Sequence, residues 1–299
     1  MSAVRVGFVG LGLMGEPMAR RLAAAGFAVR AYRVRLDRAS ELSAVGIEPA
    51  DSPQDAAQGA RFIITMLPDT SDVEGVLLGD EGIAKTLGAG QIFIDMSTIS
   101  PAATRRMADV VAKMGATALD APVSGGVIGA RQGTLSIMVG GPVAAFDEAR
   151  AIFEALGKSV TRLGESGLGQ AAKLCNQIVV AMNIQAICEA FSLGRSLGLD
   201  LSLLRDVLSG GAAGSWMIDN LGPLIVQGDE SAGFRIALQL KDLRLALEAA
   251  VEQGVPLPGA GLVSALFTEA RAHGEDSNGN QALFRVYERL SNQVIGTSR

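Results

Sequence analysis

The chain has 299 residues, which is long for a single hydrophobic core and predicts two domains. Hydrophobic residues make up 48% and charged residues 19%, a balance typical of a folded globular protein and not of a disordered one. The formal charge of −5 argues against nucleic acid or an anionic membrane as a partner, because both favour a basic surface.

Cysteine usage and hydropathy point to a cytoplasmic protein. Cys175 and Cys188 lie in one apolar stretch without metal-type spacing, so we expect reduced thiols and no metal site. The uncharged run over residues 174–188 is too short to span a bilayer, and it contains several amide side chains. A strand-like run begins at Val4, where a signal peptide would otherwise lie.

The first half of the sequence alternates short β-rich runs with helical segments. Strands are predicted over residues 4–9, 27–32, 61–67, 91–95, 116–120, 135–139 and 160–163. Helices are predicted over residues 16–25, 102–114 and 142–156. This alternation predicts an α/β domain of the Rossmann type over residues 1–163, with a doubly wound, mostly parallel sheet.

Beyond residue 164 the strand patterns end and long apolar-periodic helices follow. These helices are predicted over residues 170–197, 201–209, 236–253 and 261–273. We expect residues 164–299 to form an all-α domain that begins with one unusually long helix and serves in substrate binding and oligomerisation. Its apolar helix faces favour a homodimer or homotetramer.

A glycine-rich turn follows the first predicted strand and opens the first predicted helix. It consists of Gly10, Leu11, Gly12, Leu13, Met14 and Gly15. In this context the three glycines allow a tight turn, a close approach of backbone to pyrophosphate, and close helix–strand packing. The start of the helix adds free N–H groups for an anion. The pattern predicts dinucleotide binding.

The end of the second predicted strand bears on the choice between NAD and NADP. A carboxylate there would bind the adenosine ribose hydroxyls, but the sequence has Arg33 and Arg35 instead. A guanidinium group is suited to pairing with a 2′-phosphate. We therefore expect NADP(H) to be favoured, with NAD(H) left open.

Hydride transfer to a carbonyl needs a proton donor, and elimination leaves lysine. The one histidine, His273, lies in a polar stretch outside the glycine-rich segments, and no Tyr-x-x-x-Lys pair or zinc-binding cluster is present. Lys173 stands out because it interrupts the apolar start of the long helix, with Asn176 and Gln177 on the same face. Burial there would disfavour its charged form, whereas a lysine reaching to solvent is the alternative.

Five ordered blocks of the sequence resemble the β-hydroxyacid dehydrogenase family. They are residues 8–22, 95–101, 120–126, 167–177, and 241–243 with Phe234 before them. The family includes 3-hydroxyisobutyrate dehydrogenase, tartronate semialdehyde reductase and glyoxylate/succinic semialdehyde reductase. The resemblance implies an NAD(P)-dependent oxidoreductase that interconverts a small β-hydroxy acid, or a related hydroxy acid, and its semialdehyde.

The resemblance also implies roles for individual residues. Lys173 would be the general acid/base. Substrate would contact Ser124, Gly125, Gly126, Asn176, Gln177, Phe234 and Asp242. Besides the glycine turn and the two arginines, the cofactor would contact Met66, Leu67, Pro68, Thr98 and Lys241.

Some features limit the resemblance and leave alternatives. Many relatives have Asn where Gln177 stands, and Arg33 and Arg35 do not match the family's usual residues. A decarboxylating relative would need an acid a turn or two beyond the lysine, where Val180 and Ile184 stand. An imine-reductase-like NADPH enzyme and a non-catalytic NADP(H)-binding protein on the same fold remain alternatives.

Overall fold

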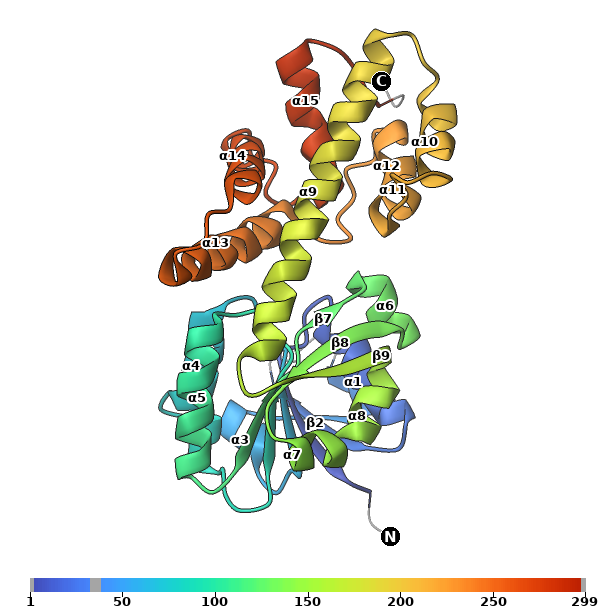
Figure 1. Ribbon diagram of the computed structural model, residues 1–299. Coiled ribbons are helices and arrows are strands. Elements are labelled where there is room, and N and C mark those ends of the chain that lie inside the picture. The colour runs from blue at the N-terminus through green and yellow to red at the C-terminus, as the bar shows by residue number, and fades with distance from the viewer. Residues whose placement is uncertain (1–2, 33–38, 297–299) are drawn as a thin grey trace. The chain divides into compact units, whose positions relative to one another are not determined.

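The computed structural model describes residues 3–32 and 39–296 and divides the chain into two compact units, Met1–Lys173 and Leu174–Arg299 (Figure 1). The predicted domain boundary lies at residues 163/164, before the long helix α9 (Leu168–Ser196). The first unit instead extends through Lys173, because the first turn of α9 is hydrogen-bonded to the sheet. Each unit is described by itself below.

The first unit is built around a mostly parallel sheet, nine-stranded within the described residues. The strands are β1 (Arg5–Val9), β2 (Ala28–Tyr32), β3 (Ile47–Pro49), β4 (Phe62–Thr65), β5 (Ile92–Asp95), β6 (Thr117–Asp120), β7 (Val123–Ser124), β8 (Leu135–Gly140) and β9 (Gly157–Gly164). Their order is β3–β2–β1–β4–β5–β6–β8–β7, with β9 parallel to β8, and β8 antiparallel to β6 and β7. The order reverses at β1, as in doubly wound sheets that bind ligands at the carboxyl ends of their strands.

Helices cover both faces of this sheet. They are α1 (Gly15–Ala24), α2 (Ala39–Ser43), α3 (Pro53–Ala57), α4 (Thr70–Leu78), α5 (Pro101–Lys113), α6 (Gly126–Gln132), α7 (Val143–Glu148) and α8 (Arg150–Leu156), with a short 3-10 helix, η2 (Ile83–Lys85). Figure 1 shows α4 and α5 on one side of the sheet and α1 and α8 on the other.

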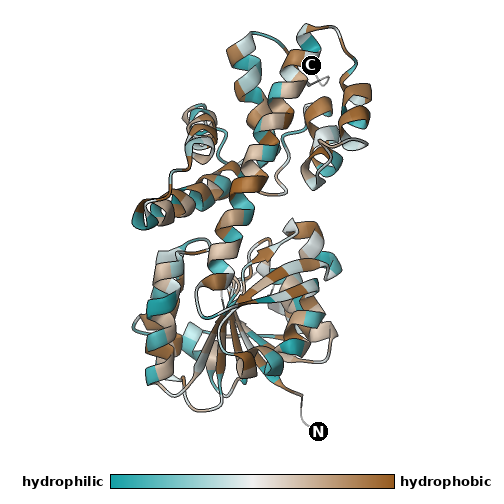
Figure 2. Cartoon of the chain, viewed as in Figure 1, coloured by the Kyte–Doolittle hydropathy of each residue, from teal (hydrophilic) through white to brown (hydrophobic). Residues whose placement is uncertain are grey.

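Alternation of side chains along the strands explains the two covered faces. In β1, Val6 and Phe8 pack into one core with α1 and α8, whereas Val9 packs into a second core with α3, α4 and α5. In β4, Ile64 joins the first core and Ile63 the second. Successive strand residues point to opposite faces, so a strand covered on both sides is hydrophobic at nearly every position (Figure 2).

The second unit is helical. Beyond the long α9 it contains α10 (Leu201–Ser209), α11 (Trp216–Asn220), α12 (Gly222–Gln227), α13 (Ile236–Gln253), α14 (Pro258–Ala272), η3 (Asn280–Leu283) and α15 (Phe284–Ser291). The core of this unit includes fully buried Phe191 of α9, Phe267 of α14 and Phe284 of α15. The prediction of an all-α second part that begins with a long helix is confirmed.

Within the described part of the chain, α9 is the one helix long and apolar enough to cross a membrane by length and composition. The core helix of a folded domain has the same properties. Ile184, Cys188 and Phe191 of α9 are fully buried among the apolar residues of the helical unit. One face of α9 therefore packs into the core of that unit.

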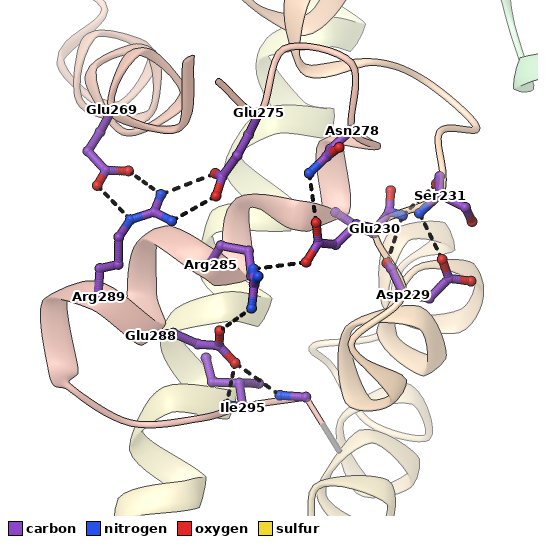
Figure 3. Close-up of polar contacts among 12 residues, drawn as sticks. Asp229, Glu230, Ser231, Glu269, Glu275, Asn278, Arg285, Glu288, Arg289 and Ile295 are labelled. Atoms are coloured by element: carbon purple, nitrogen blue, oxygen red, sulfur yellow. Dashed lines mark hydrogen bonds and ion pairs between the residues drawn. The ribbon is translucent and has the colours of Figure 1, made fainter. Parts of the chain in front are cut away.

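Ion pairs tie the last helix of the second unit to its neighbours (Figure 3). The guanidinium of Arg289 on α15 pairs with Glu269 of α14 at 2.7 Å and with Glu275 at 2.8 Å. Arg285, one turn earlier, pairs with Glu230 at 2.9 Å. These contacts fasten α15 to two other segments of the helical unit.

Most predicted helices and strands are present near their predicted ends. The helix predicted over residues 142–156 is two helices, α7 and α8, because the backbone leaves the helical conformation at Ala149 (ψ 0°). The elements that the sequence analysis did not predict are β3, β7, α2, α3, α4, α6, α11, α12, α15 and the 3-10 helices η2 and η3. The longest of them, α4, has nine residues.

Candidate active site

The three glycines of the turn after β1 differ in their surroundings. Gly10 has a φ of +105°, and a methyl group there would lie 2.4 Å from the carbonyl oxygen of Met66. A methyl group on Gly15 would lie 1.9 Å from the carbonyl oxygen of Gly10. A methyl group on Gly12, in contrast, would meet nothing within 4 Å. The first and third glycines therefore serve packing, and the open space is at Gly12.

This open space lies at the start of α1, where backbone N–H groups have no partner within the helix. Met14 precedes the helix and makes no side-chain cap. Leu11 and Met14 are half-buried against the core, whereas Leu13 is 58% exposed. The turn thus combines a packed inner side with an open outer side, and it fits a dinucleotide pyrophosphate.

The segment after β4 packs beside the turn. Met66 is half-buried, Leu67 is 6% exposed, and Pro68 is exposed. The backbone N–H of Leu67 donates to the hydroxyl of Ser97 at 2.9 Å, which links this segment to the loop after β5. Thr98, the predicted nicotinamide contact on that loop, is half-buried.

Arg33 and Arg35, the residues predicted to bind a 2′-phosphate, lie outside the described residues. The predicted preference for NADP(H) therefore stays a prediction. The strand that leads to them, β2, ends at Tyr32 and pairs with β1 beside the glycine turn.

Two other strands, β5 and β6, each end in a buried carboxylate. Asp95 ends β5, and its Oδ1 accepts from the hydroxyl of Thr65 at 2.8 Å and from the N–H of Ser97 at 3.2 Å. Burial raises the pKa of Asp95 to about 6, although these hydrogen bonds act in the opposite direction. The carboxyl group is thus held in an environment that disfavours its charge.

Asp120 ends β6 and caps the long helix α9. Its two carboxylate oxygens accept from the N–H of Gly167 at 2.8 Å and of Gln170 at 2.9 Å. Burial raises the pKa of Asp120 as well, and the same backbone donors oppose that effect. The first turn of α9 is therefore fixed to the carboxyl end of β6.

The loop that follows β6 contains the predicted carboxylate cradle. Ser124 ends the two-residue strand β7 and is half-buried. Gly125 and Gly126 both have positive φ angles, 128° and 61°, at the start of α6. A methyl group on Gly126 would meet nothing within 4 Å. Open space thus lies beside Gly126 on this loop.

Lys173 lies on the second turn of α9 and is 5% exposed. Among the chain's five lysines it alone is buried, because Lys85, Lys113 and Lys158 are exposed and Lys241 is half-buried. The expectation that Lys173 differs from the surface lysines agrees with this structure. His273 is exposed and pairs with Glu269 on the surface at 3.3 Å.

The helical unit brings the other predicted polar residues into one chain of contacts. Asn176 donates to the Gln177 side chain at 2.8 Å, and Gln177 donates to Asp242 at 2.6 Å. The other oxygen of Asp242 lies 2.8 Å from the amine of Lys241. Gln177 and Asp242 are buried, at 3% and 1% exposed. The longer amide of Gln177 thus reaches from α9 to α13.

Phe234 lies just before α13, away from that chain of contacts in the sequence, and is half-buried. Its carbonyl oxygen accepts from the N–H of Asn280 at 2.7 Å. Across residues 3–32 and 39–296, no group of three or more His, Cys, Asp or Glu side chains could hold a metal ion.

Comparison with known proteins gives the family. A sequence model described as the NAD-binding domain of 6-phosphogluconate dehydrogenase matches residues 5–164. A second, described as the NAD-binding region of NADP-dependent 3-hydroxyisobutyrate dehydrogenase, matches residues 167–287. The chain belongs to the β-hydroxyacid dehydrogenase family. It is an NAD(P)-dependent dehydrogenase or reductase that acts on hydroxyl and carbonyl groups.

Individual members of the family are similar over nearly the whole chain. The 2-hydroxy-3-oxopropionate reductase of Escherichia coli is 40% identical over 98% of this chain and 100% of its own length. The 3-hydroxyisobutyrate dehydrogenase of Pseudomonas aeruginosa is 37% identical over 94% and 98%. The structure of 3-hydroxyisobutyrate dehydrogenase from Mycobacterium tuberculosis with L-serine has a TM-score of 0.85 at 34% identity, covering 95% of this chain and 98% of that one.

The sequence analysis gave no role to Asp95, Asp120 or Gln170, although all three are buried where the carboxyl ends of β5 and β6 meet the start of α9. One signal was available for the two carboxylates. Each is the last residue of an apolar strand run, where an acidic side chain needs a specific partner because it is buried with the strand. No sequence signal identified the partner, since the contacts join residues far apart in the chain.

Proposed function

We propose that this dehydrogenase interconverts a small β-hydroxy acid and its semialdehyde, with Lys173 as general acid/base and NADP(H) as the favoured cofactor. The observation that supports this proposal most is the burial of Lys173. The first turn of its helix is held at the carboxyl ends of β5 and β6, on the sheet edge that also bears the glycine turn after β1. Doubly wound sheets bind their nucleotides at this edge.

The proton chemistry follows from the position of the amine. The bound nicotinamide supplies or accepts the hydride. In reduction the ammonium group of Lys173 donates a proton to the carbonyl oxygen of the substrate, and in oxidation the neutral amine takes it back from the hydroxyl. Burial keeps bulk water from competing for that proton.

Substrate would be held by its carboxylate and its hydroxyl. We assign the carboxylate to the hydroxyl of Ser124 and the backbone N–H groups of Gly125 and Gly126. Asn176 and Gln177 follow Lys173 by about one turn of α9 and would donate hydrogen bonds to the substrate. The proposed role of Phe234 is to line the substrate.

Cofactor contacts are proposed at the glycine turn, at Met66, Leu67 and Pro68, and at Thr98. Lys241 would contact the cofactor. Asp242 would orient either the amine of Lys241, through their ion pair, or the hydroxyl of the substrate. Arg33 and Arg35 support NADP(H), because a guanidinium pairs well with a 2′-phosphate. Initial rates with NADPH and NADH under matched conditions measure this preference.

The names of the relatives favour short acids. The E. coli relative is named for reduction of 2-hydroxy-3-oxopropionate, and the M. tuberculosis structure contains L-serine, so three-carbon acids are the first substrates to test. Glyoxylate, succinic semialdehyde and methylmalonate semialdehyde complete the panel for reduction. Threonate adds a substrate for oxidation.

The test is the Lys173→Ala variant, assayed with 2-hydroxy-3-oxopropionate and NADPH. We expect turnover to fall by about 10²–10⁴, the range for lost acid/base help, with NADPH affinity little changed. Lys113→Ala is the matched control because Lys113 is exposed on α5, and it should keep the parent turnover. A Lys173→Ala enzyme with most of its turnover would refute the assignment. Tight NADPH binding with no turnover across the panel would favour a non-catalytic protein.

We also propose that the chain is a homodimer or homotetramer. Leu193 of α9, Leu197 just after α9, and Leu203 and Val207 of α10 are each more than 60% exposed. Apolar side chains exposed in this number on neighbouring helices are typical of a surface that a second copy covers.

A further inference from the structure

Gln170 is a fully buried side chain whose amide is hydrogen-bonded at both ends. Its Oε1 accepts from the backbone N–H of Ile99 at 3.1 Å. Its Nε2 donates to the carbonyl oxygen of Ser97 at 2.8 Å and to the carboxylate of Asp95 at 3.3 Å. A flipped amide would face a donor with a donor and an acceptor with an acceptor, so one orientation is fixed.

All three partners of this amide lie on one short segment, from the end of β5 to Ile99. That segment includes Thr98, the proposed nicotinamide contact, and Ser97, whose hydroxyl accepts from the N–H of Leu67. Gln170 therefore joins the first turn of α9 to the loop that lines the proposed cofactor position.

The backbone of the same turn is held from a second side. The N–H of Gln170 donates to Asp120 at 2.9 Å, and the N–H of Gly167 donates to the other oxygen of that carboxylate. Gly169 must be a glycine here, because a methyl group on it would lie 2.4 Å from the carbonyl oxygen of Met138. The turn is thus clamped between the ends of β5 and β6.

Lys173 follows Gln170 by three residues on this helix, so the two side chains leave the same side. The rise between them is about 4.5 Å along the helix axis. The fixed amide of Gln170 consequently fixes the helix turn from which the side chain of Lys173 extends.

We propose that Gln170 is a positioning residue that holds Lys173 at its working distance from the loop after β5. This inference rests on the proposed role of Lys173 as the acid/base. Gln170 is fully buried and its amide is bonded to protein groups, so we assign it no contact with substrate and expect its effect on turnover to act mainly through the lysine. A Gln170 that served folding alone would affect stability and leave the chemical step unchanged.

The test is a double-mutant cycle on the single-turnover rate of NADPH oxidation by 2-hydroxy-3-oxopropionate. The four proteins are the parent, Gln170→Met, Lys173→Ala and the double variant. Met keeps the length of Gln and removes its hydrogen bonds. We expect Gln170→Met to lower the rate about 10²-fold in the parent, the effect of a misplacement of about 1 Å. In the Lys173→Ala background it should lower the rate less than about 3-fold, because the group it positions is gone.

Gln91→Met is the matched control. The amide of Gln91, just before β5, accepts from the N–H of Gly88 at 2.8 Å and donates to the carbonyl oxygens of Ala60 at 2.9 Å and Ala57 at 3.3 Å. Like Gln170 it accepts one hydrogen bond and donates two, but all of its partners are backbone groups at the other end of the strand. Its variant should keep the parent rate within about 3-fold, since it holds no group of the site.

Several results would overturn the inference. An equal loss in both backgrounds, or no loss in the parent, would show that Gln170 does not act through Lys173. If Lys173→Ala alone kept the parent rate, the proposed function would fail whatever Gln170 does. If Gln170→Met lost activity and Lys173→Ala did not, the proposed positioning role of Gln170 would be refuted together with the acid/base role of Lys173.

A second variant keeps the test decisive if Gln170→Met does not fold. Gln170→Glu preserves the shape, and when protonated it again offers one donor and one acceptor to the loop. We expect its rate, relative to the parent at each pH, to rise as the pH falls from 8 to 6. A ratio that stays constant over this range would contradict the inference.

Discussion

Each unit contains a network of charged side chains. In the first unit it is Asp95 and Asp120 at the carboxyl ends of β5 and β6, and it is buried. In the second unit it is the set of ion pairs around α15, and it is exposed. Asp95 and Asp120 are at most 2% exposed, and their partners are mainly backbone and neutral side chains. Arg289 and Glu269, in contrast, are 31% and 32% exposed, and they pair charge with charge (Figure 3).

Burial changes how the ionised form of a carboxyl group affects the stability of the fold. A carboxylate away from water needs several hydrogen bonds to offset its lost hydration, and the pKa of both aspartates is raised because the offset is incomplete. At the surface Arg289 lowers the pKa of Glu269, chiefly by hydrogen bonding to it. Removing a group from the buried network should therefore have the larger effect on stability, and the exposed network should depend more on salt.

The largest expected effect is that of Asp120→Ala. This change leaves the buried N–H groups of Gly167 and Gln170 without their acceptor, at about 2 kcal/mol each, so we expect a loss of about 4 kcal/mol. Urea unfolding followed by circular dichroism measures it. Asp109→Ala, at an exposed position on α5, should change stability by less than about 0.5 kcal/mol. Equal losses in both variants would mean that the buried contacts of Asp120 do not stabilise the fold.

The second prediction concerns pH and Asp95. Its pKa is about 6 in the folded protein and 3.8 in the unfolded chain, so between these values the folded state binds the extra proton. Stability from this group is therefore present below pH 4 and is lost as the pH rises to about 6, by roughly 3 kcal/mol. The free energy of unfolding of Asp95→Asn, relative to that of the parent, should therefore increase as the pH rises over this range. A constant difference between the two unfolding curves from pH 4 to 7 would contradict it.

The same contrast separates what the sequence could predict from what it could not. The turn from Gly10 to Gly15 and the helix with Lys173 are local patterns, and each was identified from adjacent residues. The long helices were equally accessible, because an apolar face repeats over several turns. Ser124 was found only through its resemblance to a family, since the two-residue strand β7 is too short to give a pattern.

The Asp120–Gln170 contact could not be predicted, because it joins residues 50 positions apart and depends on how β6 meets α9. The same holds for the pair of Gln177 and Asp242, 65 positions apart. Sequence reasoning placed Gln177 on the same helix face as Lys173 by its spacing, and Asp242 in the site by family resemblance, but it gave no contact between the two. Hydrogen bonds between distant segments follow from the fold, and the pattern of a single segment does not contain them.

The smallest expected effect is that of Arg289→Met at the exposed network. Its guanidinium makes four contacts of 2.7 to 3.1 Å to Glu269 and Glu275, so it should contribute more than an isolated surface pair, about 1 kcal/mol. At about 1 M salt the screening length falls to about 3 Å, and the loss should shrink. Arg106→Met is the control, because its single contact to Glu74 spans 3.4 Å between more exposed side chains, and its loss should be near zero. A loss for Arg289→Met that matched Asp120→Ala and did not respond to salt would mean that solvent exposure does not set the strength of these contacts.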